Sequence, residues 1–338
     1  MKFSLVLPGR EIPKHIKDCL KEQPSRSGAY NWLFLHHGEI NTFESIRNNL
    51  EDYDVLQINM SPRDMPIIPE IRRALGNSSS TKLVLNNDYV CEKWNLWGQD
   101  PYYYRQMQRC GDMVFGTEPH QTSFMINGTF TFPHPTNTKV VKRIGCDPST
   151  KDNSVGSIFH WWNPETLLTF LTVEKLKLKY GVSSRLFGYR ETNAPPDMVS
   201  KFKNYMFDDI VPQLEFPDFA NAIQRSRVVF DPNACHTYGR NGVELACWKI
   251  PVVGSDRVFS YNKLFPKLTC KPYDQNDIMK KFDMILDDTI NYKVKIQTML
   301  DEAYDAVEYF NYDNSKARYM EALETAEKRG GHSWYQKQ

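Results

Sequence analysis

The sequence predicts an α/β protein with two domains, each built around a parallel β-sheet. Short apolar runs alternate with longer helical patterns along the chain, which is typical of βαβ units. This alternation occurs twice, on either side of a polar stretch at residues 136–151. The chain has 338 residues, whereas a single hydrophobic core usually stops growing at about 250–300 residues. Two Rossmann-like domains are therefore expected, and the loops at the carboxyl ends of their strands should face one cleft.

The first predicted domain covers residues 1–145. Its first strand, residues 3–7, is a buried apolar run that ends at Pro8-Gly9-Arg10. Further short apolar runs bounded by turn residues predict more strands, and amphipathic patterns predict helices between them. The strands are expected at residues 32–36, 55–60, 82–86 and 113–116, and the helices at 68–75 and 102–110.

The second predicted domain covers residues 150–312, and residues 313–338 form a last helical segment. Within this segment Asn314 and Ser315 are expected to cap an amphipathic helix at residues 316–328. The strands of the second domain are expected at residues 155–159, 184–188, 228–230 and 251–253, and its helices at 164–180, 218–226, 243–248, 277–287 and 292–310.

The composition excludes several classes of protein. Charged residues make up 25% and apolar residues 41% of the chain, which is ordinary for a globular protein, and the net charge of +1 argues against a surface that is basic throughout. Seven cysteines without a C-x-x-C pair do not form a recognisable disulfide framework or zinc site. The apolar run at the N-terminus is too short for a signal peptide, and no stretch is long enough to span a membrane. A cytoplasmic protein is expected.

The most informative stretch follows the strand at residues 228–230. Asp231-Pro232 ends this strand, a glycine-containing turn at residues 238–242 opens a short helix, and Pro251 stops that helix. A helix N-terminus that follows glycines presents free backbone N–H groups and the positive end of the helix dipole, and both favour phosphate. Glu244 lies one turn into the helix, where its carboxylate can accept hydrogen bonds from the vicinal hydroxyls of a ribose or sugar.

This stretch resembles a motif of GT-B glycosyltransferases, in particular the retaining group that includes glycogen-synthase-like and sucrose-synthase-like enzymes. Their pattern is E-x7-E followed by A-x4-P-V-V. Glu244 matches the second Glu, His236 replaces the first, and the remainder matches at Ala246, Pro251, Val252 and Val253. The resemblance implies a GT-B fold whose last helix crosses back to the N-terminal domain. It also implies a UDP-linked sugar as donor, with no other cofactor and no metal. The competing interpretation is an ordinary helix–strand junction with a surface Glu.

The resemblance also assigns roles at the donor side. It implies that Glu244 holds the ribose, that Arg240 neutralises the diphosphate and that His236 contacts the sugar or a phosphate. Arg10 is expected to reach the donor phosphate, and His160 to donate where the family carries Arg and Lys. A solvated Arg240 and a packing His236 are the alternatives. The full set of predicted donor-binding residues is Gly9, Arg10, His160, Tyr238, Gly239, Arg240, Asn241, Gly242, Val243 and Glu244.

Two carboxylates follow strands of the first domain and are candidates for a general base toward the acceptor hydroxyl. They are Asp88 and its rival Glu118. The alternative for Asp88 is an ordinary turn residue. A retaining enzyme needs no such base, and the resemblance favours retention. Asp52-Tyr53-Asp54 has the D-x-D form of metal-dependent GT-A enzymes, but these acids precede a predicted strand instead of ending one, so we predict that they bind no metal.

Three functions are compatible with these observations. The leading one is a glycosyltransferase that moves a sugar from a nucleotide-diphosphate donor to an acceptor hydroxyl. The others are a nucleotide-sugar epimerase or hydrolase of GT-B-like fold and a non-catalytic nucleotide- or sugar-binding protein. The acceptor is open between a glycan, a lipid, a small molecule and a modified DNA base. Basic clusters at residues 139–143 and 175–179 are compatible with DNA, although such runs are usually solvated helix faces.

Overall fold

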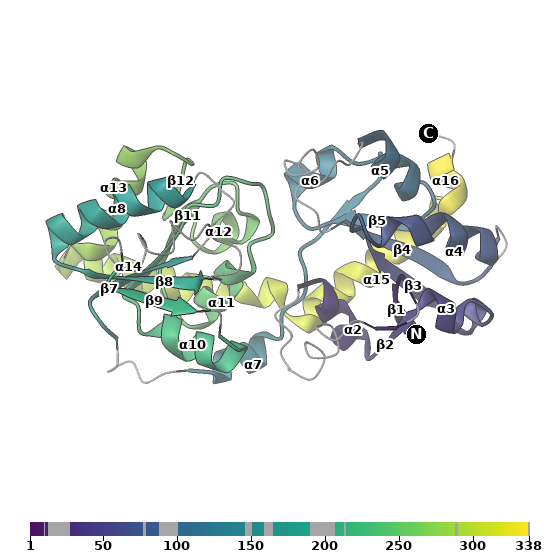
Figure 1. Ribbon diagram of the computed structural model, residues 1–338, viewed down its shortest axis with the longest axis horizontal. Helices are drawn as coiled ribbons and strands as arrows, with labels where there is room; N and C mark the ends of the chain where they lie inside the picture. Colours follow the sequence, from purple (N-terminus) through teal and green to yellow (C-terminus); the bar gives the residue numbers. More distant parts are fainter. Residues whose placement is uncertain are drawn as a thin grey trace. The chain divides into compact units, whose positions relative to one another are not determined.

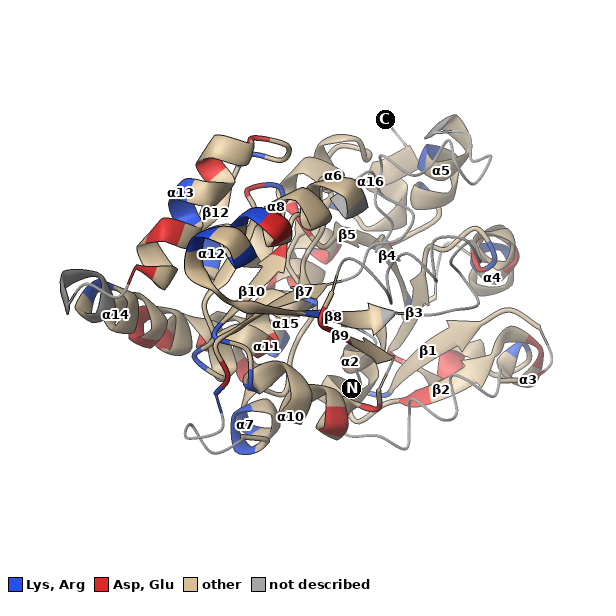
Figure 2. Ribbon diagram, turned by 60° about the vertical axis from the view of Figure 1, so that its left-hand side comes forward, with Lys and Arg blue, Asp and Glu red and all other residues tan. Residues whose placement is uncertain are grey.

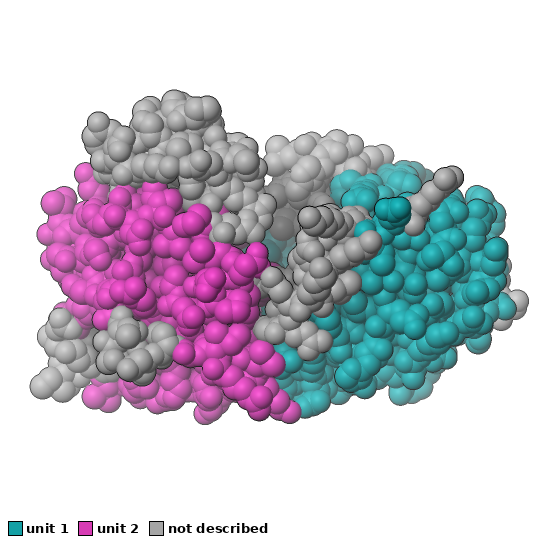
Figure 3. Space-filling model, turned by 60° about the horizontal axis from the view of Figure 1, so that its bottom comes forward, with its two compact units in different colours: residues 1–137, 236–238, 309–338 teal, residues 138–235, 239–308 magenta. Residues whose placement is uncertain are grey.

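The chain folds into two compact units (Figures 1 and 3). Unit 1 comprises Met1–Asn137, His236–Tyr238 and Tyr309–Gln338, and unit 2 comprises Thr138–Cys235 and Gly239–Glu308. Residues 138–145 thus fall in unit 2, and His236–Tyr238 falls in unit 1, which the sequence does not signal. The computed structural model describes residues 1–9, 11–12, 28–76, 79–87, 101–145, 151–158, 165–189, 207–212, 214–287 and 290–336.

Unit 1 contains a six-stranded sheet with the order β2-β1-β3-β4-β5-β6, and every pair of neighbouring strands is parallel. Its strands are β1 (Phe3–Leu7), β2 (Glu39–Thr42), β3 (Val55–Asn59), β4 (Lys82–Asn87), β5 (Met113–Gly116) and β6 (Phe130–Thr131). Its α-helices are α2 (Asn31–His36), α3 (Phe43–Ile46), α4 (Ile68–Leu75), α5 (Pro101–Gln108), α6 (Pro119–Ser123), α15 (Tyr312–Lys328) and α16 (His332–Gln336).

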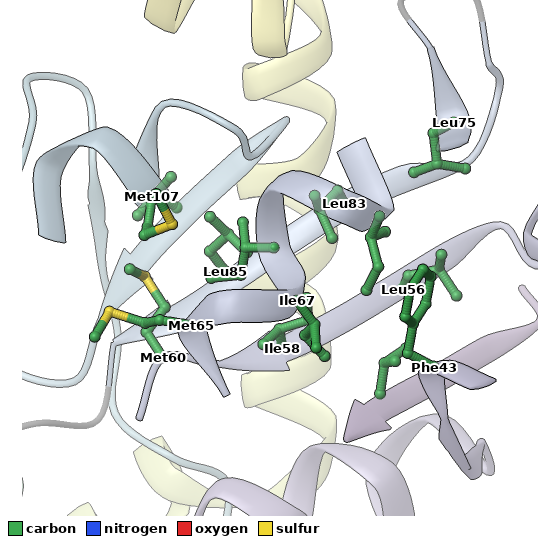
Figure 4. Packing of buried hydrophobic residues seen from close by; sticks show 14 of the residues in the cluster. Phe43, Leu56, Ile58, Met60, Met65, Ile67, Leu75, Leu83, Leu85 and Met107 are labelled. Carbon is green, nitrogen blue, oxygen red and sulfur yellow. The ribbon is translucent and has the colours of Figure 1, made fainter. Parts of the chain in front are cut away.

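Both faces of this sheet are covered, so its central strands are apolar on both sides. Leu83 and Leu85 of β4 pack into one cluster with Ile67 and Leu75, beside α4 (Figure 4). Val84, between them in the sequence, points to the opposite cluster. That cluster contains Trp32 of α2 and Tyr319, Ala322, Leu323 and Ala326 of α15.

Unit 2 contains a second parallel six-stranded sheet with the order β12-β11-β10-β7-β8-β9. When the strands are numbered from β7, this is the Rossmann order 6-5-4-1-2-3. Successive strands are added on one side of β7 up to β9 and on its other side from β10 onward. Its strands are β7 (Ser154–Ile158), β8 (Ser183–Tyr189), β9 (Asp209–Pro212), β10 (Val228–Asp231), β11 (Val252–Ser255) and β12 (Thr269–Cys270). Its helices are α7 (Thr138–Arg143), α8 (Glu165–Tyr180), α10 (Phe216–Gln224), α11 (Arg240–Cys247), α12 (Phe259–Leu264), α13 (Gln275–Leu286) and α14 (Ile290–Ala306).

The predicted return of the last helix to the N-terminal domain is confirmed. Tyr319 of α15 is fully buried, its ring centroid lies 5.1 Å from that of Trp32, and its hydroxyl donates to Gln57 Oε1 at 3.2 Å. The predicted cap is wrong, however. The side chain of Asn311 accepts from the backbone N–H of Asn314, so the helix begins at Tyr312, four residues before the predicted start at 316.

The predicted strand at residues 32–36 is also wrong, because this segment is helix α2. A short apolar run has the same pattern in a buried strand and in a buried helix. The strand that pairs with β1 on this side is β2, a half-exposed edge strand with the polar sequence Glu-Ile-Asn-Thr. His36 therefore ends a helix, not a strand. Within the described residues, no helix is both long and apolar enough to cross a membrane.

Candidate functional site

The turn between β10 and α11 requires glycine at two positions. Gly239 is the N-cap of α11 and has a left-handed backbone with φ 74°. A Cβ atom at Gly239 would lie 2.0 Å from Val258 Cγ1, and one at Gly242 would lie 2.7 Å from Tyr261 Cδ1. The first turn of α11 is thus pressed against the start of α12, and no larger residue fits without rearrangement.

A buried polar cluster lies beneath this turn. Asp231, the last residue of β10, accepts a hydrogen bond of 2.5 Å from the Tyr261 hydroxyl and one of 3.5 Å from Asn241 Nδ2. The hydroxyl of Ser260 donates to the carbonyl oxygen of Gly239. Burial and the neighbouring Asp231 carboxylate raise the pKa of Tyr261 well above its usual value, so this hydroxyl remains a donor. These bonds tie the turn to β10 and α12.

Glu244 and Arg240 form an ion pair one helical turn apart on α11. Arg240 Nε lies 3.5 Å from Glu244 Oε1, and the side chains are 34% and 4% exposed, respectively. The carboxylate is therefore held in the interior, while part of the guanidinium reaches the surface. The strand order reverses between β7 and β10. Ligands of doubly wound sheets bind outside the carboxyl ends of the strands at such a reversal, and the carboxyl end of β10 is one of these two places.

A second cation approaches the same loop. Arg257, in the turn after β11, donates from Nη1 to the carbonyl oxygen of Ala234 at 2.6 Å. No carboxylate of the described residues forms an ion pair with it. The predicted donor-binding residues do not include Arg257, Tyr261 or Asp231. Asp231 alone had a usable signal, because it directly follows the apolar run of a strand.

The residue that replaces the first Glu of the motif, His236, belongs to unit 1. Its imidazole stacks on that of His120, with ring centroids 3.6 Å apart and an interplanar angle of 24°. His120 lies in α6, whose N-cap is Glu118. The Glu118 carboxylate is 3% exposed and accepts hydrogen bonds from the backbone N–H groups of His120, at 2.8 Å, and of Gln121. His236 and Glu118 therefore both contact helix α6, one through the ring of His120 and the other as the N-cap. His120 was not among the residues predicted from the sequence.

Tyr238 is buried in unit 1 and has structural partners there. Its hydroxyl lies 3.2 Å from Thr136 Oγ1, and its ring meets those of His134 and Phe310 at 5.6 and 6.0 Å. Val243 is fully buried. Both side chains therefore pack inside the protein, so a contact between either side chain and a donor would require rearrangement.

Gly9 is the one remaining predicted site residue that lies within the described part of the chain. Gly9 directly follows Leu7-Pro8 at the carboxyl end of β1 and has φ 90°, a conformation that favours glycine. Arg10, Asp88 and His160 lie outside the described residues. At the neighbouring strand ends, Asn86 Nδ2 donates to Asn59 Oδ1 at 2.9 Å.

The acidic pair of the D-x-D sequence lies where the sequence places it, before β3. Asp52 ends a short 3₁₀ helix, Leu50–Asp52, and Asp54 accepts from the backbone N–H of Lys2 at 2.6 Å. Among the described residues, no three His, Cys, Asp or Glu side chains are grouped as a metal site.

The fold is similar to that of several solved glycosyltransferases. One is an α-glucosyltransferase in complex with UDP and a 13-mer DNA containing an HMU base; it is 13% identical, with a TM-score of 0.62, covering 96% of this chain and 99% of that one. Anabaena HepE in complex with UDP-glucose is 13% identical with a TM-score of 0.64, and 95% of this chain and 99% of that one are covered. Sucrose-phosphate synthase of Thermosynechococcus elongatus is 12% identical with a TM-score of 0.64, and the coverage is 96% and 99%.

No protein-family model matches the sequence, and no curated protein is significantly similar to it. The similarity is therefore one of fold, and it covers at least 95% of this chain and 99% of each neighbour. The chain has the GT-B fold.

Proposed function

We propose that this protein is a glycosyltransferase that moves a sugar from a nucleotide-diphosphate donor to an acceptor hydroxyl. The observation that carries the proposal is the buried Glu244 carboxylate, paired with Arg240 in the first turn of a helix that begins at the carboxyl end of β10. A carboxylate held there accepts hydrogen bonds from ribose hydroxyls, and the adjacent guanidinium and helix N-terminus attract the diphosphate.

The charges around the turn suit a diphosphate leaving group. As the bond between the sugar and the diphosphate breaks, negative charge grows on the diphosphate oxygens. Fixed positive groups aimed at these oxygens lower the barrier, because their orientation is set before the reaction. Arg240 and the N-terminal N–H groups of α11 supply this charge, and Arg257 is a further candidate. Asp231 and Tyr261 hold the turn in place through their hydrogen bond.

The remaining proposed roles fall to residues of unit 1. His236, supported by the stacked ring of His120, contacts the donor sugar or a phosphate. Asp88 is the candidate for orienting the acceptor or removing its proton. Glu118 caps α6 and thereby holds His120 in place. Its two hydrogen bonds to backbone N–H groups support this structural role. We propose retention of the anomeric configuration, because the motif at residues 244–253 is that of retaining enzymes.

The names of the structural neighbours support a UDP-linked donor, since two of the three were solved with UDP or UDP-glucose. One of them was solved with a DNA that contains a modified base. We therefore propose a base in DNA as the first acceptor to test, with a glycan or a small molecule as the second.

A panel of nucleotide sugars tests the proposal. The protein is incubated with UDP-, GDP- and ADP-sugars and with DNA containing hydroxymethylated bases, malto-oligosaccharides or no acceptor, and all products are identified by mass spectrometry. Release of nucleotide together with a glycosylated acceptor is the expected result. An isomerised donor or free sugar with every acceptor would assign an epimerase or a hydrolase. Thermal stabilisation by nucleotides without any product would assign a binding protein.

A further inference from the structure

We infer that the outer face of α5 and α6 in unit 1 binds unstacked bases of a single-stranded nucleic acid. This α5–α6 surface is defined by Tyr102, Tyr103, Arg105 and Phe124. The inference deepens the proposed function, because it names the kind of acceptor that the enzyme would hold next to its reactive group, and it rests on that proposal.

Three large aromatic rings are exposed on this surface. Tyr102 is 67% exposed, Tyr103 38% and Phe124 43%, and Met1 is the one other large hydrophobic residue of unit 1 found exposed among the described residues. Tyr104, which follows Tyr103 on α5, is fully buried and donates from its hydroxyl to the carbonyl oxygen of Met60 at 3.0 Å. The helix is therefore anchored by one tyrosine and presents two others outward.

Arg105 joins the two helices. Its Nε donates to the carbonyl oxygen of Phe124 at 3.3 Å, so the cation lies beside this aromatic residue. Arg105 is also three residues after Tyr102 on α5, and residues at this spacing are neighbours on a helix surface. Arg105 has no carboxylate partner among the described residues. Tyr102, Arg105 and Phe124 thus form one exposed patch that combines a guanidinium group with aromatic rings.

The patch continues to a predicted site residue within the same unit. The ring of Phe124 meets that of His120 edge to face, with centroids 5.0 Å apart and an interplanar angle of 71°. His120 in turn stacks on His236. A row of planar side chains therefore leads from the exposed surface of α5 to the histidine that stands in the donor motif. An acceptor strand lying on this row would have one base near His236 and its neighbours on the aromatic rings.

The chemistry of the patch favours nucleic acid over the alternatives. Every base has a π-face that stacks on an aromatic ring, and arginine both stacks on bases and pairs with phosphate. Residues 101–111 contain two arginines and no acidic residue, and residues 119–131 contain no acidic residue (Figure 2). Of the acids next to these segments that the structure describes, Asp112 pairs with Arg72 and Glu118 caps α6. In a duplex the π-faces are already stacked on one another, so this surface fits a single strand.

Fluorescence anisotropy with a labelled dT12 oligonucleotide tests the inference. Tyr102→Ala and Phe124→Ala are each expected to weaken binding by between about fivefold and a hundredfold, the range measured for loss of one base-stacking aromatic. Arg105→Ala should weaken binding and reduce the slope of log K against log salt by about 0.7 for each phosphate that the arginine neutralises. Because the substituted side chains are exposed, we expect little change in the midpoint of thermal unfolding.

Matched controls use exposed residues elsewhere. Tyr273→Ala removes a 50% exposed tyrosine of unit 2, and Arg73→Ala removes an exposed arginine of α4. Both should bind dT12 like the unchanged protein. Equal losses in the controls, unchanged affinity in the three surface variants, or tighter binding of a malto-oligosaccharide or of duplex DNA than of dT12 would each overturn the inference.

The same samples separate this inference from the proposed function. UDP affinity, measured by calorimetry, should be equal in the unchanged protein and in the surface variants. If the unchanged protein bound dT12 through this surface but bound no nucleotide sugar, the inference would stand and the proposed function would fail. If UDP-sugar bound and dT12 did not, the proposed function would stand and this inference would fail.

Discussion

The hydroxyl of Tyr261 donates a 2.5 Å hydrogen bond to the carboxylate of Asp231, beneath the turn that begins α11. The Tyr261 ring also fills the space beside Gly242 and Gly254, where a Cβ atom would lie 2.7 and 2.4 Å from it. One side chain therefore both packs against the glycines and orients the last residue of β10. The arrangement gives a turn whose backbone is fixed before any ligand arrives.

Tyr261→Phe keeps the ring and removes the hydrogen bond to a charged group. We expect the free energy of unfolding to fall by about 1.5–3 kcal/mol and UDP affinity to fall with it, since the turn loses its anchor. Denaturant titration and calorimetry measure the two effects.

The matched control is Tyr319→Phe, which removes a buried hydroxyl that donates to Gln57 in unit 1. This variant should lose stability without losing UDP affinity. Equal UDP affinities in the two variants would show that Tyr261 supports the fold alone.

Glu244→Gln tests the residue on which the proposed function depends. The amide keeps the size of the side chain, but it removes the charge that pairs with Arg240 and one acceptor for ribose hydroxyls. Charge-assisted hydrogen bonds contribute about 1.5–3 kcal/mol, so the affinity for UDP-sugar should fall at least about tenfold in calorimetry. Glu308→Gln, which breaks the 2.6 Å ion pair with Lys142, is the control and should leave donor affinity unchanged. A Glu244→Gln protein that binds its donor normally would remove the basis of the proposal.

Most of the fold was predictable because its central strands and several helices have unambiguous patterns. β1, α4 and β5 have the predicted bounds, since each is a short buried run or a clear amphipathic helix between turn residues. The edge strands β2, β9 and β12 were missed, because β2 and β9 are short and half exposed and β12 has two residues. Edge strands lack the continuous apolar run by which a buried strand is recognised.

The candidate site was predictable only where it is local in the sequence. The turn at residues 239–244 has a glycine pattern and a register that can be read directly. The Tyr261–Asp231 bond joins residues 30 apart, and the stacked His120 and His236 come from segments more than a hundred residues apart. Such pairs depend on how strands and helices pack, which no single stretch of sequence encodes.

Acid should destabilise unit 1 through His36. This ring is 6% exposed, stacks on Phe3 at 4.7 Å, and has no hydrogen-bond partner within the described residues. Burial, aided by the charge of Lys316, lowers its pKa from 6.5 to about 3. Between these values the unfolded chain binds a proton that the folded chain does not, so stability falls as the pH falls through this window. The slope should approach about 1.4 kcal/mol per pH unit.

His36→Phe tests this linkage. The variant should lose less stability than the unchanged protein between pH 6.5 and pH 4, whatever its stability at pH 7, because its ring cannot be protonated. Urea denaturation at several pH values measures the difference. Parallel pH profiles for His36→Phe and the unchanged protein would contradict the assignment.

Transfer should survive EDTA. The N-terminus of α11 and Arg240 supply positive charge to the diphosphate, and the acids of the D-x-D sequence precede β3, where Asp54 accepts from a backbone N–H group. Product formation is measured with EDTA and after addition of Mn²⁺. Loss of transfer with the chelator and recovery with Mn²⁺ would instead implicate Asp52 and Asp54, and Asp52→Asn with Asp54→Asn would then abolish the Mn²⁺ response.

Glu118 provides the sharpest test of the acceptor side, because a structural and a catalytic role predict different results. Its carboxylate accepts from two backbone N–H groups at the start of α6. Glu118→Ala should therefore lower the free energy of unfolding by about 0.5–2 kcal/mol, the usual range for loss of a helix cap. Glu118→Gln keeps one carbonyl acceptor and should keep most of the stability and of the transfer rate.

If Glu118 were instead the general base, Glu118→Gln would abolish transfer while UDP affinity and the unfolding midpoint stayed unchanged. NMR of the product would then show inversion at the anomeric carbon. Retention together with an active Glu118→Gln would leave Asp88 as the residue that orients the acceptor, and Asp88→Asn should then lower kcat without changing UDP affinity.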